Sequence, residues 1–377
     1  MSRGTSFAAE PWRVCFPIGL LCLWAGASHW VIFALGWSSD GSSVFHGIAQ
    51  TQGFVLAFAL GFLLTMIPAH TATAPASRLL LVIGAVGTFG TIVAVHQGAV
   101  SQGESAFVVL AVAMLAFAVT RLRRAARSAP AGLIWFAHAF SIALFGAVFT
   151  GIGGALGREF FAWHEFGKLC VTQGTVLALM LGAGTVAVPE LEGAAPPLGA
   201  TRRSTSLSGI AAAALVGTFA VEVLLDYRVG HTVRGLLLLG VSARPLRLLA
   251  PLPRGVDAIT VRLACWAVPL GLLAGAFSAW PRLGLHVAYA GGVAPFVLVV
   301  AAHVARAPAG ALAWATALSC AAAMCLRAAA EIDPLHRTRW LGFAAAALLV
   351  ASCAWAARVL PRCRRVSANR PGLRGLG

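Results

Sequence analysis

Long apolar runs separated by short polar segments follow one another along almost the whole chain. Each run is close to the ~20 residues that a helix needs to cross the ~30 Å hydrocarbon layer of a bilayer. Backbone groups in lipid must be hydrogen-bonded within their own segment, so the runs predict helices. We expect twelve spans, at about 14–36, 45–67, 78–97, 105–122, 131–152, 167–188, 207–226, 232–252, 259–279, 284–305, 309–330 and 338–358. The pattern predicts an all-α polytopic bundle.

The eighth run is the weakest, because Arg244 and Arg247 lie within it and it could be a half-buried segment. The distribution of arginine favours keeping it as a span. With the N-terminus in the cytoplasm, the inner loops and the C-terminal segment collect most of the arginines, as cytoplasmic loops do. These residues are Arg78, Arg121, Arg123, Arg124, Arg127, Arg202, Arg203, Arg254, Arg306, Arg358, Arg362, Arg364, Arg365, Arg370 and Arg374. Losing the eighth helix would put the loop arginines of the second half on the wrong side.

Composition excludes a soluble protein. Of the 377 residues 59% are hydrophobic and only 11% are charged, whereas a soluble domain carries roughly 25% charged residues. The net charge of +16 lies between the apolar runs, which indicates membrane topology and no nucleic-acid partner. We therefore expect a multi-pass protein of the bacterial cytoplasmic (inner) membrane, with the lipid bilayer as its surroundings and both termini in the cytoplasm.

Residues 1–366 are expected to form one transmembrane domain, and residues 367–377, rich in Gly, Pro and Arg, a disordered tail. The first run continues past its small residues for another turn or two, which favours a retained helix over a cleaved signal peptide.

The eight cysteines contain no CxxC spacing and fall mostly inside apolar runs. They indicate neither a disulfide framework nor a thiolate metal site.

Two segments of the chain match at one register. Thr51-Gln52-Gly53 recurs 121 residues later as Thr172-Gln173-Gly174, and Pro68 recurs as Pro189. A fainter third copy contains Gly291-Gly292. The pattern predicts three four-helix pseudo-repeats, at about 14–122, 131–252 and 259–358.

Histidine is the main chemical signal, since polar groups at membrane depth cost energy and are usually functional. His46, His164 and His286 each stand at the start of the second helix of a predicted unit. Three parallel helices would bring these imidazoles to one depth, and imidazole is a common ligand of haem iron, copper and zinc. Tyr289 lies three residues after His286 and could hydrogen-bond near a bound cofactor. The alternative is that such histidines only bond lipid headgroups or loop carbonyls, and it stays open.

One stretch of the chain resembles a known family. Phe45-His46-Gly47-Ile48-Ala49, followed by Gly53-Phe54, Gly61-Phe62-Leu63-Leu64-Thr65 and Pro68, is similar to the second helix of the NnrS family. The segment from Leu285-His286 to Val304 is similar to its later Leu-His helix. The resemblance implies a twelve-helix bacterial membrane protein that binds haem and copper and protects cells from nitric oxide stress.

Carried over residue by residue, the resemblance implies that His46 and His286 are cofactor ligands. Other family ligand positions are changed here: Ile48 stands where the family has a second histidine, Ala49 where it has glutamate, and Pro308 lies near a third histidine position. The resemblance therefore implies a divergent member that keeps part of the ligand set.

Two other functions remain open from the sequence. Twelve helices with internal repeats also describe secondary transporters, although few charges lie within the spans. A non-catalytic membrane subunit that packs against a redox partner is the second alternative. Whether the protein is an enzyme is left undecided by the residues.

Overall fold

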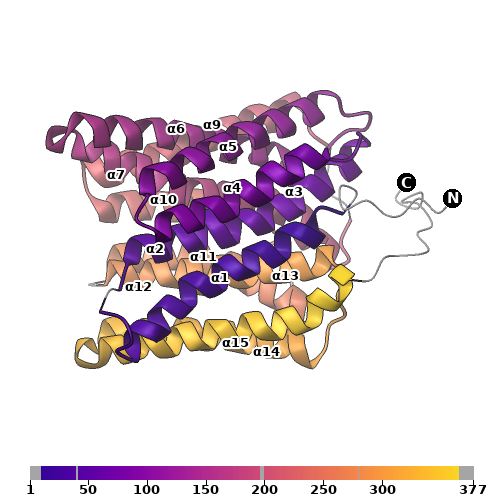
Figure 1. Cartoon of the computed structure of the whole chain (residues 1–377). Helices are drawn as coiled ribbons and strands as arrows, with labels where there is room; N and C mark the ends of the chain where they lie inside the picture. The colour runs from indigo at the N-terminus through magenta and orange to yellow at the C-terminus, as the bar shows by residue number, and fades with distance from the viewer. Residues whose placement is uncertain (1–9, 40, 196–198, 279, 365–377) are drawn as a thin grey trace.

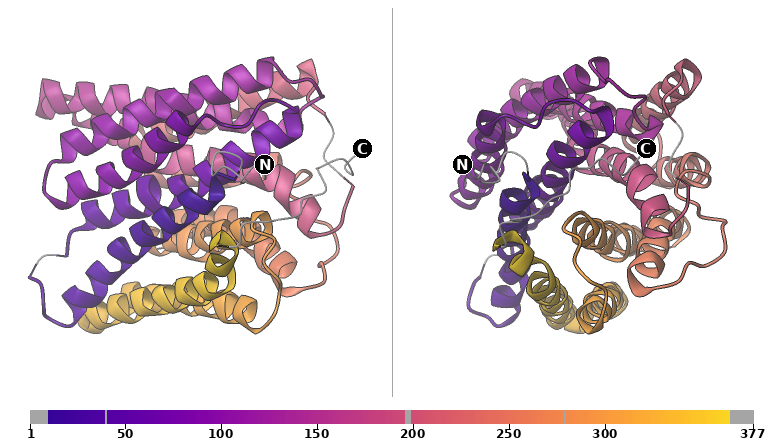
Figure 2. Two further views of the ribbon diagram at one scale, coloured as in Figure 1. Left: turned by 45° about the vertical axis from the view of Figure 1, so that its right-hand side comes forward. Right: turned by 90° about the vertical axis from the view of Figure 1, so that its right-hand side faces the viewer.

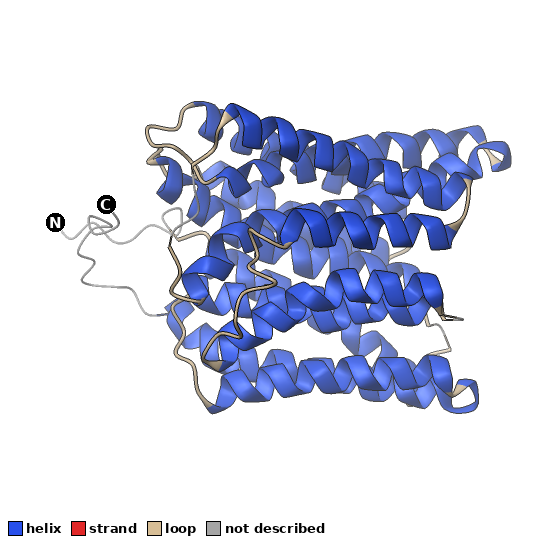
Figure 3. Ribbon diagram, turned by 180° about the vertical axis from the view of Figure 1, so that it is seen from behind, coloured by secondary structure: helices blue, strands red, loops and turns tan. Residues whose placement is uncertain are grey.

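The computed structural model describes residues 10–39, 41–195, 199–278 and 280–364 of the chain (Figure 1). The tail expected to be disordered, 367–377, lies outside these described residues. Within them the chain is helical, with loops between the helices and only an isolated bridge between Pro130 and Gly199 (Figure 3). The predicted all-α fold is confirmed.

The longer helices run through the bundle in chain order. They are α1 (Trp12–Ala34), α3 (Leu56–Thr71), α4 (Arg78–His96), α5 (Val100–Arg123), α6 (Ile134–Leu156), α8 (Thr175–Leu191), α9 (Arg202–Leu224), α10 (Tyr227–Ser242), α11 (Val256–Phe277), α13 (Ala294–Val304), α14 (Ala311–Ile332) and α15 (Arg337–Arg364). Short helices α2 (Ser43–Ile48), α7 (Phe161–Leu169) and α12 (Pro281–His286) continue into α3, α8 and α13 through π-helical turns. Three 3₁₀ turns, η3 (Ala131–Leu133), η4 (Arg158–Phe160) and η7 (Pro334–His336), precede α6, α7 and α15.

Eleven helical stretches among the described residues are long and apolar enough to cross a membrane. The expected eighth span is not one of them. Its helix, α10, begins early because Asp226 caps it by accepting from the backbone N–H groups of Arg228 and Val229. The helix ends at Ser242, and the turns that follow contain Pro245 and Pro251, which cannot continue a helix. The expectation of a single helix over 232–252 was therefore wrong.

Both ends of the described chain lie at one end of the bundle. Arg13 on α1 donates from Nη1 to the carbonyl of Cys363 on α15 over 3.0 Å. We call this the near end; α2, α7 and α12 lie at the opposite, far end (Figure 1). The two ends of the described chain therefore lie on the same side of the bundle, and the side of the membrane that they face stays a prediction.

The helices α3, α8 and α13 lie inside the bundle, with other helices around them (Figure 2). In the spans Ser43–Thr71, Phe161–Leu191 and Pro281–Val304, 72%, 89% and 61% of the most apolar stretch is buried, more than in any other span described. Their apolar halves α3, α8 and α13 contact one another in pairs. The segments that carry His46, His164 and His286 are therefore the ones placed at the centre.

Each inner helix contains a π-helical turn: η2 (Ala49–Val55), η5 (Cys170–Gly174) and η6 (Val287–Val293). Such turns are rare and insert an extra residue into the helix. Each π turn packs on a glycine of the preceding long helix, so closely that a side chain there would clash. A Cβ added to Gly26 would lie 2.9 Å from Ala49 Cβ. A Cβ added to Gly146 would lie 2.7 Å from Cys170 Cβ, and one added to Gly271 would lie 2.6 Å from the backbone N of Ala288. Small residues allow this close approach. The three-unit organisation stays a prediction, and this recurrence is the observation that favours it.

Buried ion pairs join the helices at the near end. Glu192, just after α8, pairs with Arg262 on α11 and, over 2.7 Å, with Arg247. The Glu192 and Arg262 side chains are 3% and 2% exposed. Because removal of one partner leaves a buried charge uncompensated, this contact ties α8 to α11 and to the turns after α10.

Replacing Glu192 with alanine should lower the free energy of unfolding by about 3–5 kcal/mol, because Arg262 would keep its buried charge without a partner. The measurement is reversible unfolding of the purified protein in mixed detergent micelles. Glu165→Ala is the control, since the pair of Glu165 with Lys168 is exposed and should contribute no more than about 1 kcal/mol. Equal losses in the two variants would contradict this role for Glu192.

Candidate cofactor site

Three polar clusters lie between the helices towards the far end. The first, the α14 cluster, consists of His46 on α2, His286 on α12, and Arg327 and Glu331 on α14. The two imidazoles are close enough for their charges to interact with each other and with Arg327. Arg327 is paired with Glu331 over 2.7 Å, as their i,i+4 spacing predicts.

The two histidines of the α14 cluster are held in the same way. The ring Nδ1 of His46 lies 3.0 Å from the carbonyl of Gly26, and that of His286 lies 2.7 Å from the carbonyl of Arg282. A carbonyl oxygen only accepts, so Nδ1 carries the proton and Nε2 of the neutral ring keeps its lone pair. This is the orientation that metal-ligating histidines adopt. The structure thus brings together the two histidines that the family resemblance singles out.

Arg327 gives this cluster a positive side. Its side chain is 11% exposed, and within the described part of the chain its Nη1 has no hydrogen-bond partner. Arg337 also approaches Glu331, at 3.6 Å. A free guanidinium N–H beside two neutral imidazoles suits a ligand that combines a metal with an anionic group.

The second group, the α5 cluster, contains His164. His164 on α7 has its Nδ1 3.1 Å from the carbonyl of Thr150. Its imidazole interacts electrostatically with Glu104 on α5, and that carboxylate accepts a hydrogen bond from Gln52 Nε2 over 3.0 Å. None of the described contacts of His164 involves His46 or His286. The structure therefore pairs two of the three expected ligands and places the third in a different cluster.

The third group, the α10 cluster, is centred on Arg234, whose side chain is fully buried. The guanidinium donates to Thr218 Oγ1 over 3.0 Å, to Gln173 Oε1 over 3.1 Å and to Glu222. His231 Nε2 lies 3.5 Å from the same Glu222 carboxylate. Arg234 thus has three acceptors, and the cluster satisfies its own charges.

Tyr289 faces the α10 cluster. It interacts electrostatically with Arg234 and Glu222, and its hydroxyl has no hydrogen-bond partner among the described residues. His286 interacts instead with Arg327 and Glu331. Three residues along an ordinary helix would lie on one face, but η6 begins between these two and turns the chain differently. Tyr289 therefore stays a cofactor-binding candidate through the α10 cluster, while His286 belongs to the α14 cluster.

Sequence reasoning missed Arg234 and Glu104 as members of polar clusters. The available signal for Arg234 was an arginine inside an apolar run, which in lipid requires a partner. The signal for Glu104 was weaker, because it stands in the first turns of its helix where an exposed charge is common.

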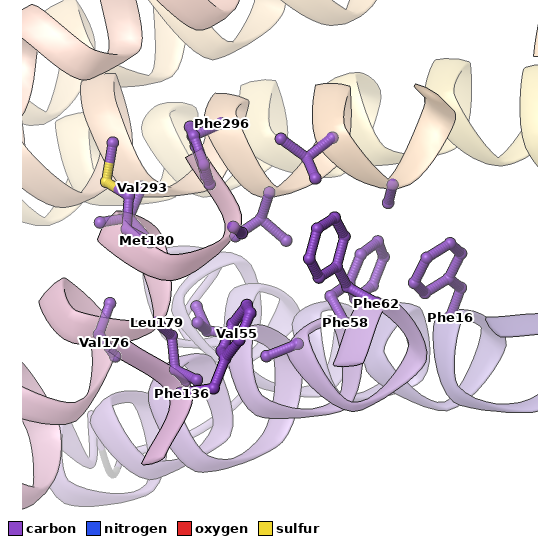
Figure 4. A pocket seen from close by; sticks show the side chains of 15 residues that line it. Phe16, Val55, Phe58, Phe62, Phe136, Val176, Leu179, Met180, Val293 and Phe296 are labelled. Atoms are coloured by element: carbon purple, nitrogen blue, oxygen red, sulfur yellow. The ribbon is translucent and has the colours of Figure 1, made fainter. Parts of the chain in front are cut away.

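No group of three or more His, Cys, Asp or Glu side chains among the described residues could hold a metal ion together. Metal binding through the α14 cluster therefore depends on two imidazoles. The best-formed cavity lies elsewhere, between α3, α8 and α13, has a volume of about 30 Å³ and is lined by apolar side chains such as Phe58, Val176 and Val293 (Figure 4). Among the described residues, its lining contains no histidine, cysteine or carboxylate. The Met180 thioether is the metal-binding type of group in this lining, and the volume is too small for a porphyrin.

The sequence matches a known protein family. The family model described as NnrS protein matches residues 6–366, nearly the whole chain. No curated protein matches the chain.

The α10 cluster should behave as one energetic unit. Arg234→Met should lower the free energy of unfolding by about 3–5 kcal/mol, because Glu222 loses its guanidinium. Adding Glu222→Gln to that variant should restore part of the loss, with a coupling energy of about 0.5–3 kcal/mol. The measurement is a double-mutant cycle by unfolding in micelles, and simply additive effects of the two substitutions would argue against the pairing.

Proposed function

We propose that this polytopic membrane protein binds haem or copper and acts in the nitric oxide and nitrosative stress response. The chain belongs to the NnrS family, and this membership supports the proposal. The site proposed is the α14 cluster, with His46 and His286 as the metal ligands. The observation that carries the proposal is the shared arrangement of these two side chains. Each has Nδ1 on a backbone carbonyl, and each keeps Nε2 for a metal.

The residues of the α14 cluster fit such a group in three respects. They supply two neutral imidazoles. They also supply a guanidinium N–H of Arg327, unpaired among the described residues, for an anionic substituent. Helices from the two ends of the sequence fix the positions of both histidines. When bound, the group would supply a metal centre able to bind nitric oxide. The chain's own contribution is to fix the imidazole orientation through Gly26 and Arg282 and to balance charge through Arg327 and Glu331.

The altered family positions limit the ligand set. Ile48 and Ala49 are both buried, and Ala49 packs on Gly26 of α1. Apolar packing has taken the place of two polar ligands there. We therefore propose His46 and His286 as the ligand pair, with His164 as a metal ligand only in its own cluster.

We also propose that the protein lies in the bacterial cytoplasmic membrane with both termini in the cytoplasm. The near end, where Arg13 contacts Cys363, would then face the cytoplasm. The α14 cluster would lie towards the outer surface, where a ligand can enter from the periplasm.

Protein purified in detergent from a haem-sufficient host should show a Soret absorption band or bound copper. His46→Ala and His286→Ala should each reduce the bound cofactor at least tenfold, because each removes one of two ligands. The measurements are a visible spectrum and metal analysis of the same sample.

His336→Ala is the matched control, since His336 is an exposed histidine beside Asp333 in the loop before α15. It should leave the cofactor content unchanged. Wild-type protein without haem and without copper, or loss of cofactor equal in all three variants, would overturn the proposed site.

A further inference from the structure

Glu104 differs from the other carboxylates inside the bundle. Five of these have a basic partner: Glu222 pairs with Arg234, Glu331 with Arg327, Glu192 with Arg262, Asp257 with Arg358, and Glu190 with His303. Among the residues that the structure describes, neither arginine nor lysine forms an ion pair with Glu104. Its hydrogen-bond partner is the neutral amide of Gln52. A carboxylate at this depth without a cation is costly, so either a proton neutralises Glu104 or a bound cation balances its charge.

The Gln52 amide presents a second acceptor beside that carboxylate. Its side chain is 2% exposed, and its Nε2 is used by Glu104. The remaining atom, Oε1, has no hydrogen-bond partner within the described part of the chain. An unpaired buried acceptor costs about 1–3 kcal/mol. A cation or donor at this place would therefore be stabilised both by Gln52 Oε1 and by the Glu104 carboxylate.

His164 contributes a third acceptor. Its Nδ1 is held by the Thr150 carbonyl, which leaves the lone pair on Nε2 of the neutral ring. The side chain interacts with the charge of Glu104. Its position on α7 is fixed by Gly153 of α6, where an added Cβ would lie 2.8 Å from His164 Cα.

In the α10 cluster, a glutamine at the equivalent position of the predicted repeat has a positively charged side chain of the protein beside it. Gln173 lies 121 residues after Gln52, at the same point of its own π-helical turn. There the amide Oε1 accepts from the Arg234 guanidinium, which also pairs with a carboxylate, Glu222. The two glutamine amides thus differ: the Arg234 guanidinium lies against Gln173 Oε1, whereas no cationic side chain among the described residues is bonded to Gln52 Oε1.

We propose that Glu104, Gln52 Oε1 and His164 form a binding site for a divalent metal cation. The Glu104 carboxylate and the His164 imidazole are of the ligand types that Zn²⁺ prefers, and the Gln52 amide oxygen adds a neutral oxygen donor. The cation enters from the far end, because Glu104 lies near the start of α5 and is partly exposed. This site is separate from the α14 cluster and does not rest on the proposed haem or copper binding.

The experiment measures Zn²⁺ binding to chelator-stripped full-length protein in micelles by equilibrium dialysis and metal analysis. Wild type should bind one Zn²⁺ more than Glu104→Gln. Gln52→Leu and His164→Ala should each weaken that site at least tenfold. Glu165→Gln is the matched control: this carboxylate is the neighbour of His164 on α7 but is paired with Lys168, so Zn²⁺ binding should stay at the wild-type value.

The same stoichiometry and affinity in wild type, Glu104→Gln and Gln52→Leu would overturn the site. Infrared spectroscopy of the wild type gives a readout that needs no variant to fold. Zn²⁺ should convert the absorption of a protonated carboxyl group to that of a carboxylate, whereas a protonated band that persists at saturating Zn²⁺ would show that a proton alone neutralises Glu104. His46→Ala should leave this site intact, which separates its outcome from that of the haem or copper test.

Discussion

The requirement that charge inside a lipid-embedded bundle be compensated locally governs the arrangement of this protein. Arg234 illustrates it: a fully buried guanidinium is surrounded by a carboxylate and a hydroxyl from α9 and an amide from η5. Glu192 with Arg262 meets the same requirement at the near end. These contacts also fix which helices are neighbours, because a displaced partner would leave a charge in an apolar environment. Packing of small residues on the π turns then sets how closely the helices approach.

The same requirement distinguishes the three clusters. The α10 cluster contains both signs and is complete. Judged from the residues that the structure describes, the α14 cluster has a paired arginine with an unused N–H and two imidazoles, and the α5 cluster has a carboxylate without a cation. The arrangement of charges therefore points to different ligands for these two clusters, even though both are built around an inner helix. It favours a metal cofactor with an anionic group in the α14 cluster and a metal cation in the α5 cluster.

Fold class followed from the sequence because run length and hydrophobicity are set directly by the bilayer. The predicted helix over 232–252 had the wrong boundaries, because a hydropathy pattern does not detect helix caps or prolines. Asp226 caps the helix at an earlier position, and Pro245 and Pro251 prevent it from continuing. Within the site, the repeat predicted that His46, His164 and His286 lie at one depth, and the structure places His46 and His286 in the α14 cluster and His164 in the α5 cluster. Their register with His164 was not predictable, because the π-helical turns change which face a residue presents. Arg234 and Gln52 were missed as partners since pairing across distant helices leaves no local spacing.

The cavity between the three inner helices has a consequence for ion conduction. Its ~30 Å³ would admit a water molecule by volume, but a buried water needs about 2–4 polar partners, and Phe58, Val176 and their apolar neighbours provide none. The apolar lining therefore disfavours water in the cavity at the centre of the bundle. A continuous file of water along the axis is disfavoured, so the protein can hold polar ligands between its helices without short-circuiting the membrane potential.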